Sequence, residues 1–193
     1  MVTRHSLQWL RVGAICAAVV VLSAGYVLVV NAVLPHSNLT ITVGWSESQF
    51  NATWVEANTS GAAGYLVRSN ESISVNANGT VQPGGIVTAQ NFKLPAWNLT
   101  NYPYLTVTVR SSSTYLAVRI MVWTGSMSPH DVVLSTFNDR SWHPIYVDLT
   151  GMLGYTGSLQ PYLIELGWFV VQQPVGPNPS VQFEDLALVS LRG

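Results

Sequence analysis

Six Asn-x-Ser/Thr sequons are the residues of this chain whose types and spacing most clearly predict chemistry, because this tripeptide accepts an N-linked glycan on its asparagine amide. The six asparagines all precede residue 101, and they are Asn38, Asn51, Asn58, Asn70, Asn78 and Asn98. Asn178 is excluded, since Pro179 in the middle position blocks the acceptor conformation. Such glycans are added to exported segments, so the sequons predict a glycoprotein whose residues 36–193 are extracytoplasmic.

The side chains that most often perform catalysis are sparse and scattered. The nine Asp and Glu residues form no evident pair of the kind that glycoside hydrolysis requires. The exported part has only His36, His130 and His143, whereas a zinc site needs about three or four ligands. The chain also lacks the G-x-S-x-G, H-E-x-x-H and phosphate-loop motifs. We therefore expect a non-catalytic protein that requires no cofactor.

The composition gives no basis for binding nucleic acid. Only 9% of the residues are charged, against about 25% in an average soluble domain, and the formal net charge is −1. Either N-linked glycans or a large interface with partner subunits could account for so few surface charges, and both alternatives stay open. The sequon density, the single lysine (Lys93) and the low charge resemble the composition of archaeal surface glycoproteins.

An uncharged apolar segment, residues 12–34, precedes the sequons and predicts a transmembrane helix in the lipid bilayer. At about 1.5 Å per residue it would span roughly 34 Å, close to a bilayer core of about 30 Å. The apolar regions of secretory signals are shorter, at roughly 7–15 residues. Arg4 and Arg11 flank the inner end, so we expect residues 1–11 to be a cytoplasmic tail and the chain to be a single-pass signal-anchor protein of the cell membrane. Cleavage after Ala32 is the alternative.

The elements that would position any site in the exported part are predicted to be β-strands. Residues 104–110 and 115–123 alternate apolar and polar side chains, and residues 111–114 would join them as a hairpin. The apolar sets expected to face the core are Leu105, Val107 and Val109 in the first strand, and Leu116, Val118, Ile120 and Val122 in the second.

Shorter segments with strand character recur along the rest of the exported part. They are residues 39–45, 53–57, 72–75, 86–92, 132–137, 144–149, 162–172 and 181–191. Roughly nine or ten strands with short polar connections predict an all-β fold, namely a two-sheet β-sandwich formed by a single domain over residues 36–193.

Three sequence runs between about residues 98 and 191 resemble the galactose-binding-like β jelly roll of carbohydrate-binding modules. The matching positions are Leu105, Val107 and Val109, then Trp142, Ile145, Val147, Asp148 and Leu149, and finally Phe183, Asp185, Leu186 and Leu188. The resemblance implies a jelly-roll sandwich. Folds of this kind host sugar binding, adhesion and purely architectural roles.

Sugar binding needs exposed aromatic rings and a few polar groups that fix the orientation of the ligand. The face of the central strands that points away from the core offers Arg119, Met121, Trp123, Tyr146 and Glu165. These side chains form either a sugar-binding platform, which the resemblance would place on the concave face, or a contact face for a partner subunit.

The resemblance further implies a structural calcium ion near the last strand. Glu184 and Asp185 would be its ligands, and Glu47 or Glu56 could add another carboxylate.

These features together predict a membrane-anchored surface glycoprotein that serves as an accessory or structural subunit of a larger assembly. A membrane-tethered carbohydrate-binding module is the alternative. Because every sequon precedes residue 101, the surface formed by residues 101–193 is expected to be the one open to a partner.

Overall fold

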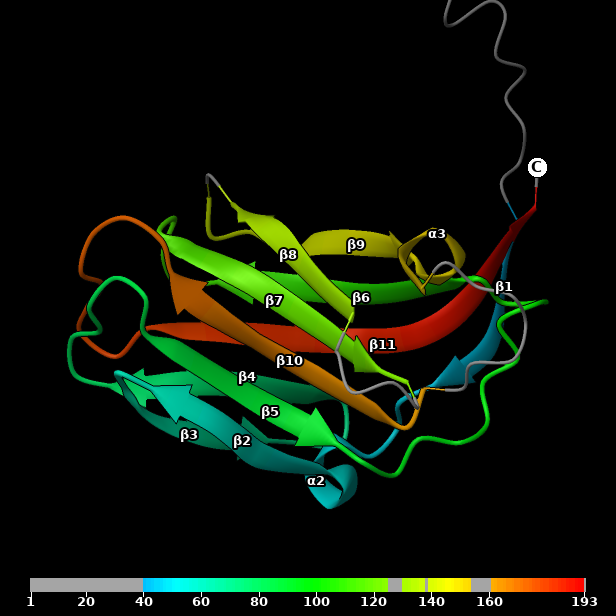
Figure 1. Cartoon of the computed structure of the whole chain (residues 1–193), viewed down its shortest axis with the longest axis horizontal. Coiled ribbons are helices and arrows are strands. Elements are labelled where there is room, and N and C mark those ends of the chain that lie inside the picture. The colour runs from blue at the N-terminus through cyan, green and yellow to red at the C-terminus, as the bar shows by residue number, and fades with distance from the viewer. Residues whose placement is uncertain (1–39, 125–129, 138, 154–160, 193) are drawn as a thin grey trace, which may run out of the picture. The chain divides into compact units, whose positions relative to one another are not determined.

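The computed structural model describes residues 40–124, 130–137, 139–153 and 161–192, and these form two antiparallel β-sheets packed as a sandwich (Figure 1). The predicted fold class, an all-β two-sheet sandwich, is therefore confirmed. The predicted cytoplasmic tail and transmembrane segment, residues 1–34, lie outside the described part of the chain. Within the described part, no helix is long and apolar enough to cross a membrane.

Each sheet combines strands from both halves of the chain. Sheet A has the order β3-β4-β11-β6-β9, and β1 also pairs with β11; sheet B has the order β2-β5-β10-β7-β8. The strands of sheet A are β1 (Thr40–Ser46), β3 (Ala63–Arg68), β4 (Ser72–Asn78), β6 (Tyr104–Ser111), β9 (His143–Asp148) and β11 (Ser180–Arg192). The strands of sheet B are β2 (Trp54–Ser60), β5 (Ile86–Asn91), β7 (Leu116–Trp123), β8 (His130–Thr136) and β10 (Leu163–Val170). Two short helices, α2 (Phe50–Thr53) and α3 (Leu149–Leu153), follow β1 and β9.

The core fills the space between the sheets with alternate residues from the facing strands. The apolar sets predicted for β6 and β7 are all buried in it, which confirms the direction of both strands. Trp168 of β10 crosses the interior, and its indole Nε1–H donates a hydrogen bond of 2.7 Å to the carbonyl oxygen of Val75 in β4. This buried bond links the two sheets directly.

The predicted hairpin at residues 111–114 is wrong. β6 pairs with β9 and β11 in sheet A, whereas β7 pairs with β8 and β10 in sheet B. Residues 111–114 therefore cross from one sheet to the other. The alternation of apolar residues identifies which side chains enter the core. It does not reveal whether the next strand lies beside the first in the same sheet or faces it from the other sheet, because both arrangements bury the same side chains.

One strand was not predicted. β3 is a sheet-edge strand, and four of its six residues are exposed, so it lacks a buried apolar face. Its Gly64 allows close packing between the two sheets, because a Cβ there would lie 2.5–2.6 Å from side-chain carbons of Thr59 and Val87.

The chain order separates the two sides of the sandwich. Strands β2 to β5 occupy one side, strands β6 to β9 occupy the other, and β10 and β11 run between them in their respective sheets (Figure 1).

Replacing Trp168 by Phe is expected to lower the free energy of unfolding by about 2–3 kcal/mol, because it removes a cross-sheet hydrogen bond and leaves a small void. Urea denaturation followed by circular dichroism measures the change. The matched control is Trp142→Phe, a half-exposed ring on the surface, which should cost less than about 1 kcal/mol. Equal losses for the two variants would contradict the assigned role of Trp168.

Asp148 caps the start of α3, and its ionisation should contribute to stability. Its Oδ1 accepts hydrogen bonds from the backbone N–H groups of Gly151 and Thr150, both at 3.0 Å, and from the Thr150 hydroxyl. These hydrogen bonds, that from Gly151 foremost, hold the pKa of the Asp148 carboxyl below its ordinary value of 3.8. A lowered pKa favours folding above the unfolded-state value, and this contribution is lost as the pH falls through the folded-state pKa.

Asp148→Ala is therefore expected to cost about 1 kcal/mol at pH 7, and the difference from the native chain should shrink as the pH drops below about 4. Denaturation curves at several pH values test this. The Asp148→Asn variant keeps an oxygen acceptor and should retain most of the stability at every pH. If the loss of unfolding free energy in Asp148→Ala does not change with pH, the stabilising role of the ionised Asp148 carboxylate is contradicted.

Candidate binding site

The predicted platform residues divide between the two sheets. Arg119, Met121 and Trp123 of β7 and Glu165 of β10 share the outer face of sheet B, where Glu165 pairs with Met121 in the register. Tyr146 lies instead on β9, on the outer face of sheet A, opposite Thr106 of β6. The placement of Tyr146 on one face with the other four was therefore wrong, because the outward direction of a residue does not reveal which sheet its strand joins.

The centre of the outer face of sheet B offers little accessible surface. Met121 and Glu165 are only 5% and 4% exposed. Gln90 of β5 donates a side-chain hydrogen bond to Oε1 of Glu165, which helps to satisfy the buried carboxylate. Trp123 is half-buried, and its indole N–H is buried without a hydrogen-bond acceptor among the described residues. This set is mainly a packed layer, and a sugar ring could stack on little of it.

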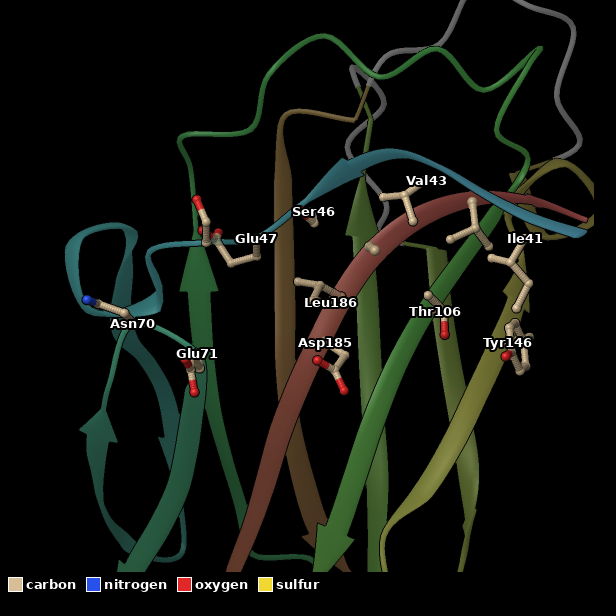
Figure 2. A pocket seen from close by; sticks show the side chains of 13 residues that line it. Ile41, Val43, Ser46, Glu47, Asn70, Glu71, Thr106, Tyr146, Asp185 and Leu186 are labelled. Carbon is tan, nitrogen blue, oxygen red and sulfur yellow. The ribbon is translucent and has the colours of Figure 1, made fainter.

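A groove of about 640 Å³ lies on the outer face of sheet A, beneath β1 (Figure 2). It extends from the turn between β3 and β4, over β11 and β6, to Tyr146 on β9 (Figure 2). The lining residues are Ile41, Val43, Ser46, Glu47, Ser48, Asn70, Glu71, Thr106, Tyr146, Asp185, Leu186, Ala187 and Val189.

A β-bulge in β11 shapes the centre of the groove. Glu184 pairs with Thr108 and Ala187 with Thr106, so Asp185 and Leu186 together stand opposite a single residue of β6. Asp185 takes a left-handed backbone conformation with φ of 52°, which Asp tolerates better than most residues. The extra residue turns the Asp185 carboxylate to the groove while Leu186 still fills the core.

Exposed apolar side chains form the walls of the groove. Ile41 and Val43 of β1 are 46% and 56% exposed, and the ring of Tyr146 is 49% exposed at the opposite end from Asn70 (Figure 2). Ala187 and Val189 of β11 line it as well and are almost fully buried. Apolar surface of this kind costs free energy in water and is typical of ligand or partner contacts.

Polar groups lie beside these walls. The turn between β3 and β4 presents Asn70 and Glu71, and the Ser69 hydroxyl oxygen fixes that turn by accepting the N–H groups of Glu71 (3.2 Å) and Ser72 (2.9 Å). Asp185 and Thr106 both line the groove between its two ends (Figure 2). The groove therefore combines an apolar wall with hydrogen-bond acceptors.

Glu47 holds one end of the groove in place. Its Oε2 accepts hydrogen bonds from Asn91 Nδ2 (2.9 Å), Trp54 Nε1 (3.2 Å) and Thr53 Oγ1 (3.2 Å), and its Oε1 accepts the N–H of Gln49 (2.9 Å). Asn91 and Trp54 belong to sheet B, Thr53 to α2, and Gln49 immediately precedes α2. The backbone N–H of Glu47 donates instead to the carbonyl oxygen of Leu186 in the β11 bulge at 2.8 Å. Glu47 therefore ties the end of β1 to both sheets, to sheet B through its carboxylate and to β11 of sheet A through its backbone N–H.

The predicted calcium ligands are not gathered into a metal site in the described part of the chain, which contains no group of three or more His, Cys, Asp or Glu side chains arranged to hold a metal. Asp185 is exposed in the groove, and Glu184 is half-buried beside it. Glu56 lies on β2 of sheet B, and the Glu47 carboxylate already accepts four hydrogen bonds. Calcium at Glu184 and Asp185 stays a prediction.

Four of the six sequon asparagines lie on the side of the sandwich formed by strands β2 to β5. Asn51 lies in α2, Asn70 in the turn after β3 and Asn78 at the end of β4, and all three are exposed. Asn98 is also exposed, in the connection between β5 and β6. Asn58 belongs to β2 on the same side, and Asn38 lies outside the described residues. Glycosylation stays a prediction at all six asparagines, and the exposure of Asn51, Asn70, Asn78 and Asn98 permits it at those four.

No protein-family model and no curated protein matches the chain. Among solved structures, the Endo-D glycoside hydrolase domain from Streptococcus pneumoniae R6 aligns with a TM-score of 0.50 and 13% identity, over 71% of this chain and 21% of that one. A family 11 carbohydrate-binding module from Clostridium thermocellum aligns with a TM-score of 0.48 and 13% identity, over 74% of this chain and 93% of the module. A module described for specific mannan recognition, TmCBM27, aligns with a TM-score of 0.45 and 10% identity, over 80% of this chain and 99% of the module. At these identities the likeness extends to the sandwich fold alone.

Sequence reasoning missed most of the groove. The alternation of Ile41, Val43 and Trp45 predicts a strand that faces the core, and only Trp45 packs against it, with its ring 5.4 Å from that of Trp97. The exposure of Ile41 and Val43 could have been predicted only by knowing that β1 pairs with β11, the central strand of sheet A.

Glu47→Gln is expected to lower the free energy of unfolding by about 2 kcal/mol, because the amide NH₂ group that replaces one carboxylate oxygen cannot accept hydrogen bonds from the surrounding donors. Chemical denaturation at pH 7 measures the loss. Glu56→Gln provides the control, since Glu56 is exposed on β2 and should tolerate the same change within about 0.5 kcal/mol. A native-like stability of the Glu47 variant would contradict the anchoring role.

Proposed function

We propose that this protein is a non-catalytic surface protein that binds a neutral saccharide in the groove of sheet A. The observation that carries the proposal is the half-exposed ring of Tyr146 and the apolar side chains of β1, set in one groove with the carboxylates of Asp185 and Glu71.

This combination matches the two kinds of surface on a sugar. The C–H face of a pyranose ring is apolar and stacks on an aromatic ring, while the hydroxyl groups at its edge donate hydrogen bonds to carboxylates. The volume of about 640 Å³ also lies within the range of roughly 300–1,000 Å³ that is typical of ligand sites. Because Asp185 and Glu71 are both acidic, the groove favours a neutral ligand over an anionic one.

The proposal includes the location inferred from the sequence. Residues 12–34 would anchor the chain in the cell membrane, with residues 36–193 outside and N-linked glycans on the sequon asparagines. One of these asparagines, Asn70, lines the groove, so its glycan would extend from the end opposite the Tyr146 ring (Figure 2). Tethering a binding domain to the membrane would keep bound saccharide close to the cell surface.

A second function, that of an accessory subunit in a larger surface assembly, is favoured by the placement of the sequons. Asn51, Asn58, Asn70 and Asn78 belong to α2, β2, the β3–β4 turn and β4, so glycans there would cover one side of the sandwich. The opposite side, bounded by the edge strands β8 and β9, would be left for a protein partner (Figure 1).

Replacing Tyr146 by Ala should weaken saccharide binding by about tenfold or more, because it removes the stacking surface worth roughly 1.5 kcal/mol. A glycan array with the full chain identifies the ligand, and isothermal titration calorimetry then measures the dissociation constants of the native chain and the variant.

Tyr162→Ala is the matched control, since Tyr162 is 47% exposed but does not line the groove. This variant should bind the saccharide with the same affinity as the native chain. The proposal fails if no saccharide binds the native chain, or if Tyr146→Ala binds as tightly as the native chain does. Stoichiometric partners recovered from native membranes, with no saccharide bound, would instead favour the accessory-subunit function.

A further inference from the structure

A second pocket opens on the outer face of sheet A, four residues further along β6 than the Thr106 that lines the groove. Its volume is about 360 Å³. The lining residues are Arg110 and Ser111 at the end of β6, Ser112 just after it, Ser180 and Gln182 at the start of β11, and Arg140 from the connection between β8 and β9. No carboxylate is among them. The chain has only eight lysines and arginines, so two arginines in one small pocket concentrate positive charge there.

Arg110 is held in a fixed orientation inside this pocket. Its guanidinium carbon lies 4.7 Å from the centre of the Trp142 ring. Its Nε and Nη2 both donate hydrogen bonds to the side-chain oxygen of Gln182. Because these partners are neutral, they orient the guanidinium without neutralising its charge, and the Nη1 hydrogens stay available to a ligand.

Arg140 adds a second guanidinium, which has no hydrogen-bond or ion-pair partner in the described part of the chain and is exposed. The adjacent carboxylate of Asp139 is directed elsewhere: it accepts the N–H of Ser141 at 2.9 Å and contacts Nε2 of His143 at 2.7 Å. These contacts hold the pKa of Asp139 below its ordinary value.

A hydroxyl group completes the set of donors. The Ser112 oxygen accepts the backbone N–H of Ser180 at 2.8 Å, so its own hydrogen is free to donate. Two guanidinium groups and a hydroxyl that face one pocket form a set of donors suited to an oxyanion, because charge-assisted hydrogen bonds from arginine are strong and directional.

We propose that this pocket binds an oxyanion, meaning a sulfate, phosphate or carboxylate group, either free or carried by an acidic saccharide. This inference goes beyond the neutral-saccharide function and does not depend on it. The two sites share no lining residue, and their charges have opposite sign.

The test titrates sodium sulfate into the isotopically labelled full chain and follows the amide and arginine side-chain resonances by NMR at constant ionic strength. Saturable shifts are expected at Arg110, Arg140 and Ser112. Arg140→Gln should weaken the binding of sulfate at least tenfold, and because Arg140 is exposed its loss should leave the fold intact. Arg68→Gln removes the same charge from the exposed β3 edge and is expected to bind sulfate like the native chain.

A parallel titration with an oligogalacturonate and with its neutral methyl ester separates the two sources of the anion. If the native chain binds the oligogalacturonate more tightly than sulfate, and Arg140→Gln abolishes that binding, the natural ligand is an acidic saccharide. Binding of sulfate alone identifies a free anion, and both results support the pocket. The proposal is overturned if sulfate causes no saturable shift, or if Arg140→Gln and Arg68→Gln weaken binding equally. Loss of neutral-saccharide binding in Tyr146→Ala leaves these results unchanged.

Discussion

The apolar contact between the inner faces of the two sheets supports every other feature of this molecule. Nearly all of the buried apolar side chains belong to one continuous core, and Trp168 adds a hydrogen bond across it to Val75. Burial of this apolar surface provides the main driving force for folding. Since the inner faces alone form the core, the outer faces can carry groups that would be costly in the interior, such as the paired arginines and the groove carboxylates.

The groove illustrates how small departures from a regular strand create a site on a rigid frame. A regular β11 would alternate strictly and direct Asp185 into the core beside Phe183, where an ionised carboxylate is costly. The bulge inserts one residue, so that Asp185 faces the groove and Leu186 returns to the core. Glu47 then fixes the end of β1 through its hydrogen bonds to both sheets, which holds the exposed apolar side chains of β1 in place beside β11.

The same sheet face carries two environments of opposite charge. Asp185 and Glu71 line the groove, whereas Arg110 and Arg140 line the pocket at the other end of β6. With only 9% of its residues charged, the chain has little other charge to mask these groups, so each site imposes its own preference on a ligand. A chain that bound both a neutral sugar unit and an acidic group would therefore find them at separate places on one surface.

Local periodicity in the sequence was enough to predict the sandwich and the inward residues of β6 and β7, because the side-chain period of two is a property of the strand itself. It did not reveal that β6 and β7 join different sheets, that β3 is a strand, or that Tyr146 lies apart from Trp123. Those facts depend on which strands pair, and pairing is decided by contacts between segments far apart in the chain. The groove and the arginine pocket follow from that pairing, since β11 brings Asp185 beneath β1 and Gln182 beside Arg110 only once the sheet has formed.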